Sequence, residues 1–256
     1  MRRFFISSHA LTTDRAQLNR TSAQISGPEF HHLRHVLRLD IGAQIALYDE
    51  RGTTYRGTLT HLAKDHAEVR LTDTLPPSAP TFRLTLAQSL LKGGKMDLVV
   101  EKATELGIHT ILPFFSDFTV ARIPSAKQAE RVARWRRLAQ AAAKQSGSPL
   151  PKITSTMSFE TLLHSSPSHA VKLICSEREH SIHLKAFAED SPNLDAVWIA
   201  VGPEGGFSSQ EIERARATGC TPVSLGPSIL RSETAGISAV ALCQFLWSDI
   251  QFPPLP

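Results

Sequence analysis

Two glycine-containing loops in the second half of the chain carry the residues best suited to hold a ligand. The first, GPEGG at 202–206, follows an apolar run that favours a buried strand and precedes a segment that favours a helix. Ligands of parallel α/β sheets bind at this carboxyl edge, where glycine lets backbone amides approach them closely. The loop lacks the Gly-Lys-Ser/Thr of a phosphate loop, and Glu204 would repel phosphate, so a cationic or hydroxyl-bearing ligand suits it better. The alternative is a tight turn that needs glycine only for its backbone geometry.

The second loop, LGPSILRSETA at 225–235, places Arg231 and Glu233 on either side of Ser232. The small residues that follow predict a helix from about Glu233 to Trp247, and Ser232 is expected to cap its N-terminus. Arg231 and Glu233 form either a surface ion pair, which contributes little to stability, or a residue of the site and the carboxylate that orients it.

Positive charge is concentrated in one segment. The chain of 256 residues has a formal net charge of +4, which is too small to identify a nucleic-acid binder. Residues 121–152 have a charge of +7, whereas the other 224 residues sum to −3. The basic side chains there are Arg122, Lys127, Arg131, Arg134, Arg136, Arg137, Lys144 and Lys152, against Glu130 alone. This pattern predicts a basic helix that either contacts RNA or presents a solvated face.

Neither the histidines nor the cysteines show a metal-binding pattern. Three histidines fall within residues 31–35 without a carboxylate or cysteine at ligand spacing, so we expect two exposed imidazoles, one packed imidazole and no metal. Cys175, Cys220 and Cys243 lie far apart, which indicates reduced thiols in a cytoplasmic protein. The apolar runs are too short for a signal-peptide core or a membrane span. We therefore expect no membrane partner.

The first part of the chain, residues 1–74, is predicted to be a small β-barrel. A short helix begins near Pro28. The predicted strands are RRFFI at 2–6, AQIALYD at 43–49, TTYRGTL at 53–59 and AEVRLT at 67–72. Three prolines between residues 72 and 81 cannot continue a helix or a central strand, so we place a domain linker there.

The second part, residues 82–252, alternates strands with helices. This order predicts an α/β domain on a mainly parallel sheet that is covered on both faces. The predicted strands are FRLTLAQS at 82–89, TILPFF at 110–115, VKLICS at 171–176 and AVWIAVG at 196–202. Helices are expected at 96–107 and 125–147, and a third follows GPEGGF, where Ser208 and Glu211 form a capping box.

Four motifs, in this order, resemble the RsmE family of bacterial 16S ribosomal RNA uracil-N3 methyltransferases, which belong to the SPOUT (α/β-knot) superfamily. The motifs are KMDLVVEKATELGIHTILPFFSDFTV at 95–120, RWRRLAQAAAKQS at 134–146, GPEGGFSSQEI at 202–212 and LGPSILRSETA at 225–235. RRFFI and HHLRHVLRL near the N-terminus are similar to the family's RNA-binding domain. The resemblance therefore covers nearly the whole chain.

The resemblance implies a SPOUT trefoil-knot methyltransferase domain at 82–252, preceded by a PUA-like RNA-binding β-barrel at 1–74. It also implies S-adenosylmethionine as cofactor, 16S rRNA of the small ribosomal subunit as partner, and a homodimer with its site near the subunit interface. The implied cofactor-binding residues are Val201, Gly202, Glu204, Gly205, Gly206, Leu225, Gly226, Ile229, Leu230, Arg231, Thr234 and Ala235. The implied RNA-binding residues are Arg3, His32, Arg34, Arg38, Arg134 and Arg137.

Transfer of a methyl group to N3 of a specific uridine requires removal of the N3 proton, so Arg231 is the expected stabiliser of negative charge and Glu233 its expected partner. No residue stands out as the general base. N3 lies on the pairing edge, so the uridine must be unpaired or flipped out. The chain has Ser148 and Ser228 where the family commonly has arginine, which affects the expected RNA contacts more than cofactor binding. The alternatives are a non-catalytic RNA-binding or ribosome-assembly protein and a SPOUT methyltransferase acting on transfer RNA.

Overall fold

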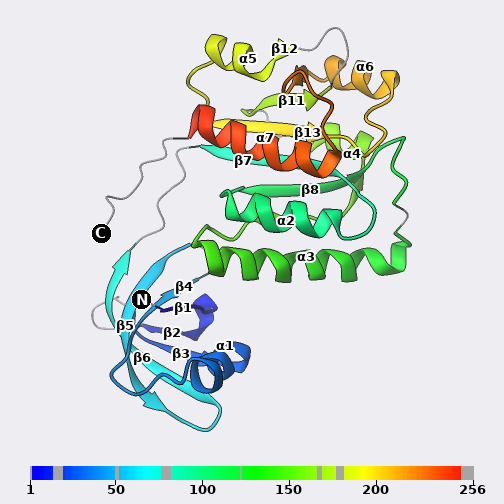
Figure 1. Ribbon diagram of the computed structural model, residues 1–256. Helices are drawn as coiled ribbons and strands as arrows, with labels where there is room; N and C mark the ends of the chain where they lie inside the picture. The colour runs from blue at the N-terminus through cyan, green and yellow to red at the C-terminus, as the bar shows by residue number, and fades with distance from the viewer. Residues whose placement is uncertain are drawn as a thin grey trace. The chain divides into compact units, whose positions relative to one another are not determined.

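The structure, a computed structural model, describes residues 2–13, 20–49, 52–75, 82–121, 123–165, 169–176 and 182–248. The chain divides into two compact units, residues 1–79 and 80–256 (Figure 1). Parts of three predictions lie outside the described residues: the linker at 76–81, Arg122 of the basic segment, and the end of the second predicted domain, 249–252.

In the part of the first unit that the structure describes, a six-stranded sheet has the strand order β1-β4-β5-β6-β3-β2 and is accompanied by two short helical segments, η1 and the continuous α1–η2. β1 pairs with β4 in parallel, and the other neighbours pair antiparallel. Its elements are β1 (Arg2–Phe5), η1 (Ser8–Ala10), β2 (Leu11–Thr13), β3 (Arg20–Ser26), α1 (Gly27–His31), η2 (His32–Val36), β4 (Gln44–Tyr48), β5 (Thr54–Leu62) and β6 (His66–Leu75). The four predicted strands are confirmed, and β2 and β3 were missed.

The core of the first unit is built from alternate residues of the strands, such as Ile45 and Leu47 of β4, together with Phe30 and Leu33 of the helical segment. The ring of His32 packs edge-on against Phe4, at 6.2 Å between centroids. His31 and His35 are exposed. The expected pattern of two exposed imidazoles and one packed imidazole is therefore confirmed.

Among its described residues, the second unit contains a parallel sheet of eight strands, in the order β10-β8-β7-β13-β11-β14-β12, with β9 also beside β8. Its strands are β7 (Arg83–Ser89), β8 (Thr110–Phe115), β9 (Lys152–Ile153), β10 (Met157–Ser158), β11 (Val171–Cys175), β12 (Ile182–His183), β13 (Ala196–Val201) and β14 (Thr221–Ser224). Its helices are α2 (Lys95–Glu105), α3 (Ser125–Ser146), α4 (Phe159–His164), α5 (Leu184–Asp190), α6 (Ser209–Ala217) and α7 (Ser232–Trp247).

Both faces of this sheet are covered, as predicted for a parallel sheet. All six residues of β13 are buried: Val197, Ile199 and Val201 point to one core, while Trp198 and Ala200 point to the other. Helices α2, α3, α5 and α7 contribute to the first core, and α4 and α6 to the second. Helix α7 returns from β14, near the sheet edge, to pack on the central strands β7 and β13 beside α2 (Figure 1).

Candidate active site

The two glycine loops meet at the carboxyl edge of the parallel sheet and enclose a cavity of about 980 Å³. This volume lies within the roughly 300–1,000 Å³ of typical small-molecule sites. The lining residues are Lys95, Cys175, Ser176, those at 201–207, those at 223–232, and Ala235. Eleven of the twelve predicted cofactor-binding residues are among them. The twelfth, Thr234, is exposed and does not belong to the lining.

Several positions of the loops favour glycine. A Cβ atom on Gly202 would lie 3.1 Å from the carbonyl carbon of Gly206, and one on Gly205 would lie 3.1 Å from Cβ of Phe118. Gly206 and Gly226 adopt φ values of +70° and +151°, which side chains disfavour. A larger residue would therefore crowd its neighbours at Gly202 or Gly205 and would be strained at Gly206 or Gly226. These same glycines leave backbone groups accessible from the cavity.

A buried carboxylate fixes the wall beside the first loop. Glu211 of α6 accepts hydrogen bonds from Ser116 Oγ at 3.1 Å, from the Asp117 amide at 3.0 Å and from the Ser208 amide at 2.9 Å. The Ser208 hydroxyl accepts from the Glu211 amide, so the predicted capping box is confirmed. This network ties the segment after β8, which contains Phe118, to the start of α6.

The prediction that Ser232 caps α7 is wrong. Arg231 occupies the N-cap position, and Ser232 is the first helical residue. The Ser232 hydroxyl instead donates to the carbonyl oxygen of Gly202 and accepts from Gln88 Nε2 at 3.1 Å. Because the hydroxyl is used in these buried contacts, it joins the second loop to the first and to β7 rather than capping its own helix.

Lys95 brings together acidic residues from both loops. Its Nζ atom lies 3.3 Å from Glu204 Oε1 and 3.2 Å from Glu233 Oε2. The nearby carboxylate of Glu233 raises the pKa of Lys95 most, burial opposes this, and Glu204 adds to the increase. Burial favours a higher pKa for Glu233, but its own backbone amide, Lys95 and Arg231 lower the pKa overall. Lys95 and Glu233 are therefore both charged at neutral pH.

Lys95 was not among the predicted site residues. The available signal was its position: it follows Gly93 and Gly94 at a strand-to-helix junction on the same sheet edge, and it opens one of the four motifs. The expected pairing of Arg231 with Glu233 is not among the ion pairs of the described residues, because Glu233 pairs with Lys95. Arg231 is exposed and lines the cavity.

The predicted RNA-binding residues lie on both units. In the first unit, the guanidinium of Arg3 lies 5.8 Å from the ring centroid of Tyr48, His32 packs on Phe4, and Arg34 and Arg38 are exposed. The two predicted RNA-binding residues of the second unit, Arg134 and Arg137, lie on α3. Arg134 pairs with Asp97 at 2.6 Å, and Arg137 is exposed.

Ser148 and Ser228, where the resemblance led us to expect arginine, lie in different settings. Ser148 follows α3, and its hydroxyl donates to the carbonyl oxygen of Glu105 at 3.0 Å. Ser228 lines the cavity. Ser228 therefore belongs to the candidate site, whereas Ser148 lies just beyond the end of the basic helix.

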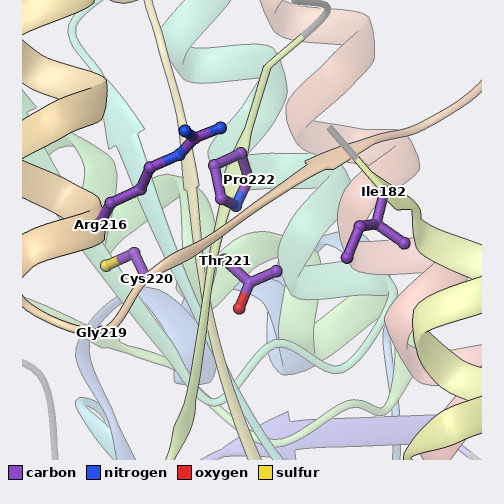
Figure 2. A pocket seen from close by; sticks show the side chains of 6 residues that line it. All are labelled: Ile182, Arg216, Gly219, Cys220, Thr221 and Pro222. Carbon is purple, nitrogen blue, oxygen red and sulfur yellow. The ribbon is translucent and has the colours of Figure 1, made fainter. Parts of the chain in front are cut away.

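A second depression, of about 620 Å³, lies at the amino ends of β12 and β14, opposite the edge that carries the cavity. Figure 2 shows Arg216 and Ile182 on either side of the backbone at Thr221 and Pro222. This depression contains none of the predicted site residues.

Within the described ranges, no helix is long and apolar enough to cross a membrane. In the same part of the chain, no three side chains of histidine, cysteine, aspartate or glutamate are grouped so that they could hold a metal ion.

Comparison with known proteins agrees with this arrangement. An RNA methyltransferase domain model matches residues 77–244, and an RNA methyltransferase PUA domain model matches residues 25–72. The chain is similar to ribosomal RNA small subunit methyltransferase E of Bacillus subtilis, at 29% identity over 96% of both chains. It is also similar to the protein of that name from Synechocystis, at 32% identity over 93% of this chain and 77% of that one.

Among solved structures, it is similar to a ribosomal RNA small subunit methyltransferase E from Neisseria gonorrhoeae bound to S-adenosylmethionine. The TM-score is 0.83 at 30% identity, over 98% of this chain and all of that one. The predicted fold, a SPOUT α/β-knot methyltransferase domain preceded by a PUA-like domain, is confirmed. The chain belongs to the ribosomal RNA small subunit methyltransferase E family of RNA methyltransferases.

Proposed function

We propose that this chain transfers a methyl group from S-adenosylmethionine to N3 of a specific uridine in the 16S rRNA of the small ribosomal subunit. The observation that carries the proposal is the cavity of about 980 Å³ between the two glycine loops. It supports the proposal because the chain shares its fold and family with the methyltransferase from Neisseria gonorrhoeae that binds S-adenosylmethionine.

The residues that line the cavity match the chemical groups of this cofactor. Its apolar walls, which suit an adenine ring, are Val223, Leu225, Ile229 and Leu230. The glycine loops present backbone groups to polar atoms of the ligand. Among the lining residues, Glu204 supplies a carboxylate that can face a sulfonium cation. When bound, the cofactor supplies an electrophilic methyl group. We propose that the eleven predicted residues that line the cavity contact it.

The protein's contribution to the reaction is alignment and electrostatic stabilisation. Holding two reactants in line can supply roughly 7–11 kcal/mol of the barrier. Negative charge develops on uracil as N3 loses its proton, and the exposed guanidinium of Arg231 is the proposed stabiliser of that charge. Glu233 is ionised and held by Lys95, so we assign it a supporting role in placing the residues of the second loop.

We propose that residues 1–74 capture the RNA and that 82–252 form the methyltransferase domain. The PUA domain match over 25–72 supports the first assignment. The proposed RNA contacts are Arg3, His32, Arg34 and Arg38 in the first domain, and Arg134 and Arg137 on α3. These groups supply cations for phosphate and an imidazole that can stack on a base.

We also propose that the chain acts as a homodimer in the cytoplasm, where small-subunit RNA is found. Helices α2 and α7 pack side by side and expose the apolar side chains of Leu98, Leu242 and Phe245. Ile229 lines the cavity and is 84% exposed. A partner subunit that covers these side chains would complete the cavity wall near Ile229.

Methylation by the purified protein tests the function. Small ribosomal subunits, protein-free 16S rRNA and total transfer RNA are incubated separately with methyl-labelled S-adenosylmethionine, and the modified nucleosides are identified by mass spectrometry. We expect 3-methyluridine in the 16S rRNA of at least one of the first two substrates, and micromolar-range cofactor affinity by calorimetry. Label in transfer RNA alone would identify a transfer RNA methyltransferase. RNA binding without cofactor binding would identify a non-catalytic assembly protein.

A further inference from the structure

One ammonium group joins three segments that form the cavity. Lys95 begins α2 just after β7, Glu204 lies in the loop after β13, and Glu233 lies in the first turn of α7. We propose that Lys95 is a positioning residue: by binding Glu204 and Glu233, it holds the loops at 202–206 and 225–235 at a fixed spacing. This inference rests on the proposed function, in which the two loops bind the cofactor.

The stability of α2 does not explain a lysine at this position. The N-terminus of a helix carries partial positive charge, so a cation there is unfavourable, whereas an acidic residue is favourable. Asp97 supplies the acidic group in the first turn of α2. The two carboxylates that offset the Lys95 charge come from outside its helix, and the Glu233 side chain is only 12% exposed. The ammonium is thus placed for the cavity rather than for its own helix.

The loops also need such a connection. Glycine-rich segments have large backbone freedom, which a ligand must otherwise restrict when it binds. On the buried side, the hydroxyl of Ser232 joins the second loop to Gly202 of the first. On the cavity side, the Lys95 bridge joins Glu204 of the first loop to Glu233 of the second. The two connections together define the distance between the cavity walls.

Calorimetry with S-adenosylmethionine and S-adenosylhomocysteine tests the role without measuring activity. We expect Lys95→Met to weaken both ligands about fivefold to tenfold, because each must then order the loops. Lys95→Arg keeps a cation that can contact two carboxylates and should restore affinity to within about twofold. Lys92→Met is the matched control: Lys92 is exposed, lies one short turn earlier and does not line the cavity, so affinity should not change.

Calorimetry on a variant that lacks both carboxylates shows whether Lys95 acts through them. In a protein that already carries Glu204→Gln and Glu233→Gln, Lys95→Met should change affinity by less than about twofold, because the interaction it removes is already gone. An equally large loss in that background, or wild-type affinity in the single Lys95→Met variant, would overturn the positioning role alone. Failure of the wild-type protein to bind either ligand would overturn the proposed function, and this inference with it.

Discussion

Arg231 is the basic residue of the cavity that is open to a substrate. The ion pairs of the described residues engage Lys95 but not Arg231, and the Arg231 side chain is exposed at the start of α7. Arg231→Ala should lower the methylation rate about 100-fold, as does loss of other groups that stabilise developing negative charge. Cofactor affinity should stay within about threefold. The carbonyl oxygen of residue 231 accepts a hydrogen bond from the Ala235 amide, and this backbone bond does not depend on the side chain at 231.

Single-turnover methylation and calorimetry, measured on the same preparations, separate these two effects. Arg231→Lys keeps the charge but not the planar group and should give an intermediate rate. A rate near that of wild type in Arg231→Ala would exclude the guanidinium as the stabilising group.

The charge of Glu233 gives a pH prediction. Burial favours a higher pKa for this carboxyl, but its own amide, Lys95 from α2 and Arg231 at the N-cap hold the pKa below its ordinary value. Glu204 faces it across the shared Lys95 ammonium. Protonation of Glu233 removes its charge and breaks the bridge to Lys95, so in wild type cofactor affinity should fall as the pH is lowered through this depressed pKa. In Lys95→Met no bridge exists, so affinity should not depend on the protonation of Glu233.

Calorimetric titrations between neutral and acidic pH measure this difference. Glu233→Gln also lacks the carboxylate and should lose the acidic limb of wild type. An acidic limb of the same size in wild type, Lys95→Met and Glu233→Gln would show that Glu233 does not control affinity.

At the scale of elements, sequence patterns identified segments that are buried on both faces. The run AVWIAV of β13 can only be a central strand, because both of its faces are apolar and all its residues are buried. β3, RTSAQIS, was missed because it has few apolar residues. The Ser232 cap was predicted from local preference, and a contact with Gly202, 30 positions away, decided otherwise. Helix-capping preferences consider only neighbouring residues of the sequence, so they could not predict a hydrogen bond to Gly202.

Helix α3 carries a prediction about RNA binding. Arg137 is exposed, whereas Arg134 is paired with Asp97. Arg137→Ala should weaken RNA binding and reduce the log–log slope of its salt dependence by about 0.7–0.9, the value for one phosphate neutralised by one cation. Arg134→Ala should have a smaller effect, since any phosphate contact there competes with Asp97. Binding to 16S rRNA fragments, measured across a series of salt concentrations, gives both slopes.

Arg136 provides a matched control on the same helix. Its guanidinium is hydrogen-bonded to the carbonyl oxygen of Ile153, at 2.8 Å from one terminal nitrogen. Arg136→Ala should therefore leave the salt slope unchanged. A slope unaffected by Arg137→Ala would remove α3 from the RNA-binding surface.

At the scale of the whole molecule, the site depends on a topology that local patterns do not specify. β7 and β13 are neighbours although more than 100 residues separate them, and α7 crosses back over both. Alternation of strands and helices predicted a parallel sheet but not its strand order, and the ordinary rules of topology exclude knots. The two loops could be assigned to one cavity only through the family resemblance. The bridge from Lys95 to both loops is formed only in the folded chain, by residues more than 100 positions apart.

The exposed apolar side chains of α7 lead to the prediction of quaternary structure. Phe245 is 77% exposed, and Leu98 and Leu242 on the packed pair α2 and α7 are also exposed. Burying a phenylalanine contributes about 1.5–3 kcal/mol, and a twofold interface would bury it once in each subunit. Phe245→Asp should therefore convert a dimer into monomers in analytical ultracentrifugation. Val36→Asp, at an exposed apolar residue of the first unit, should leave the dimer intact. If Phe245→Asp and wild type sediment alike, this face of α7 is not the subunit interface.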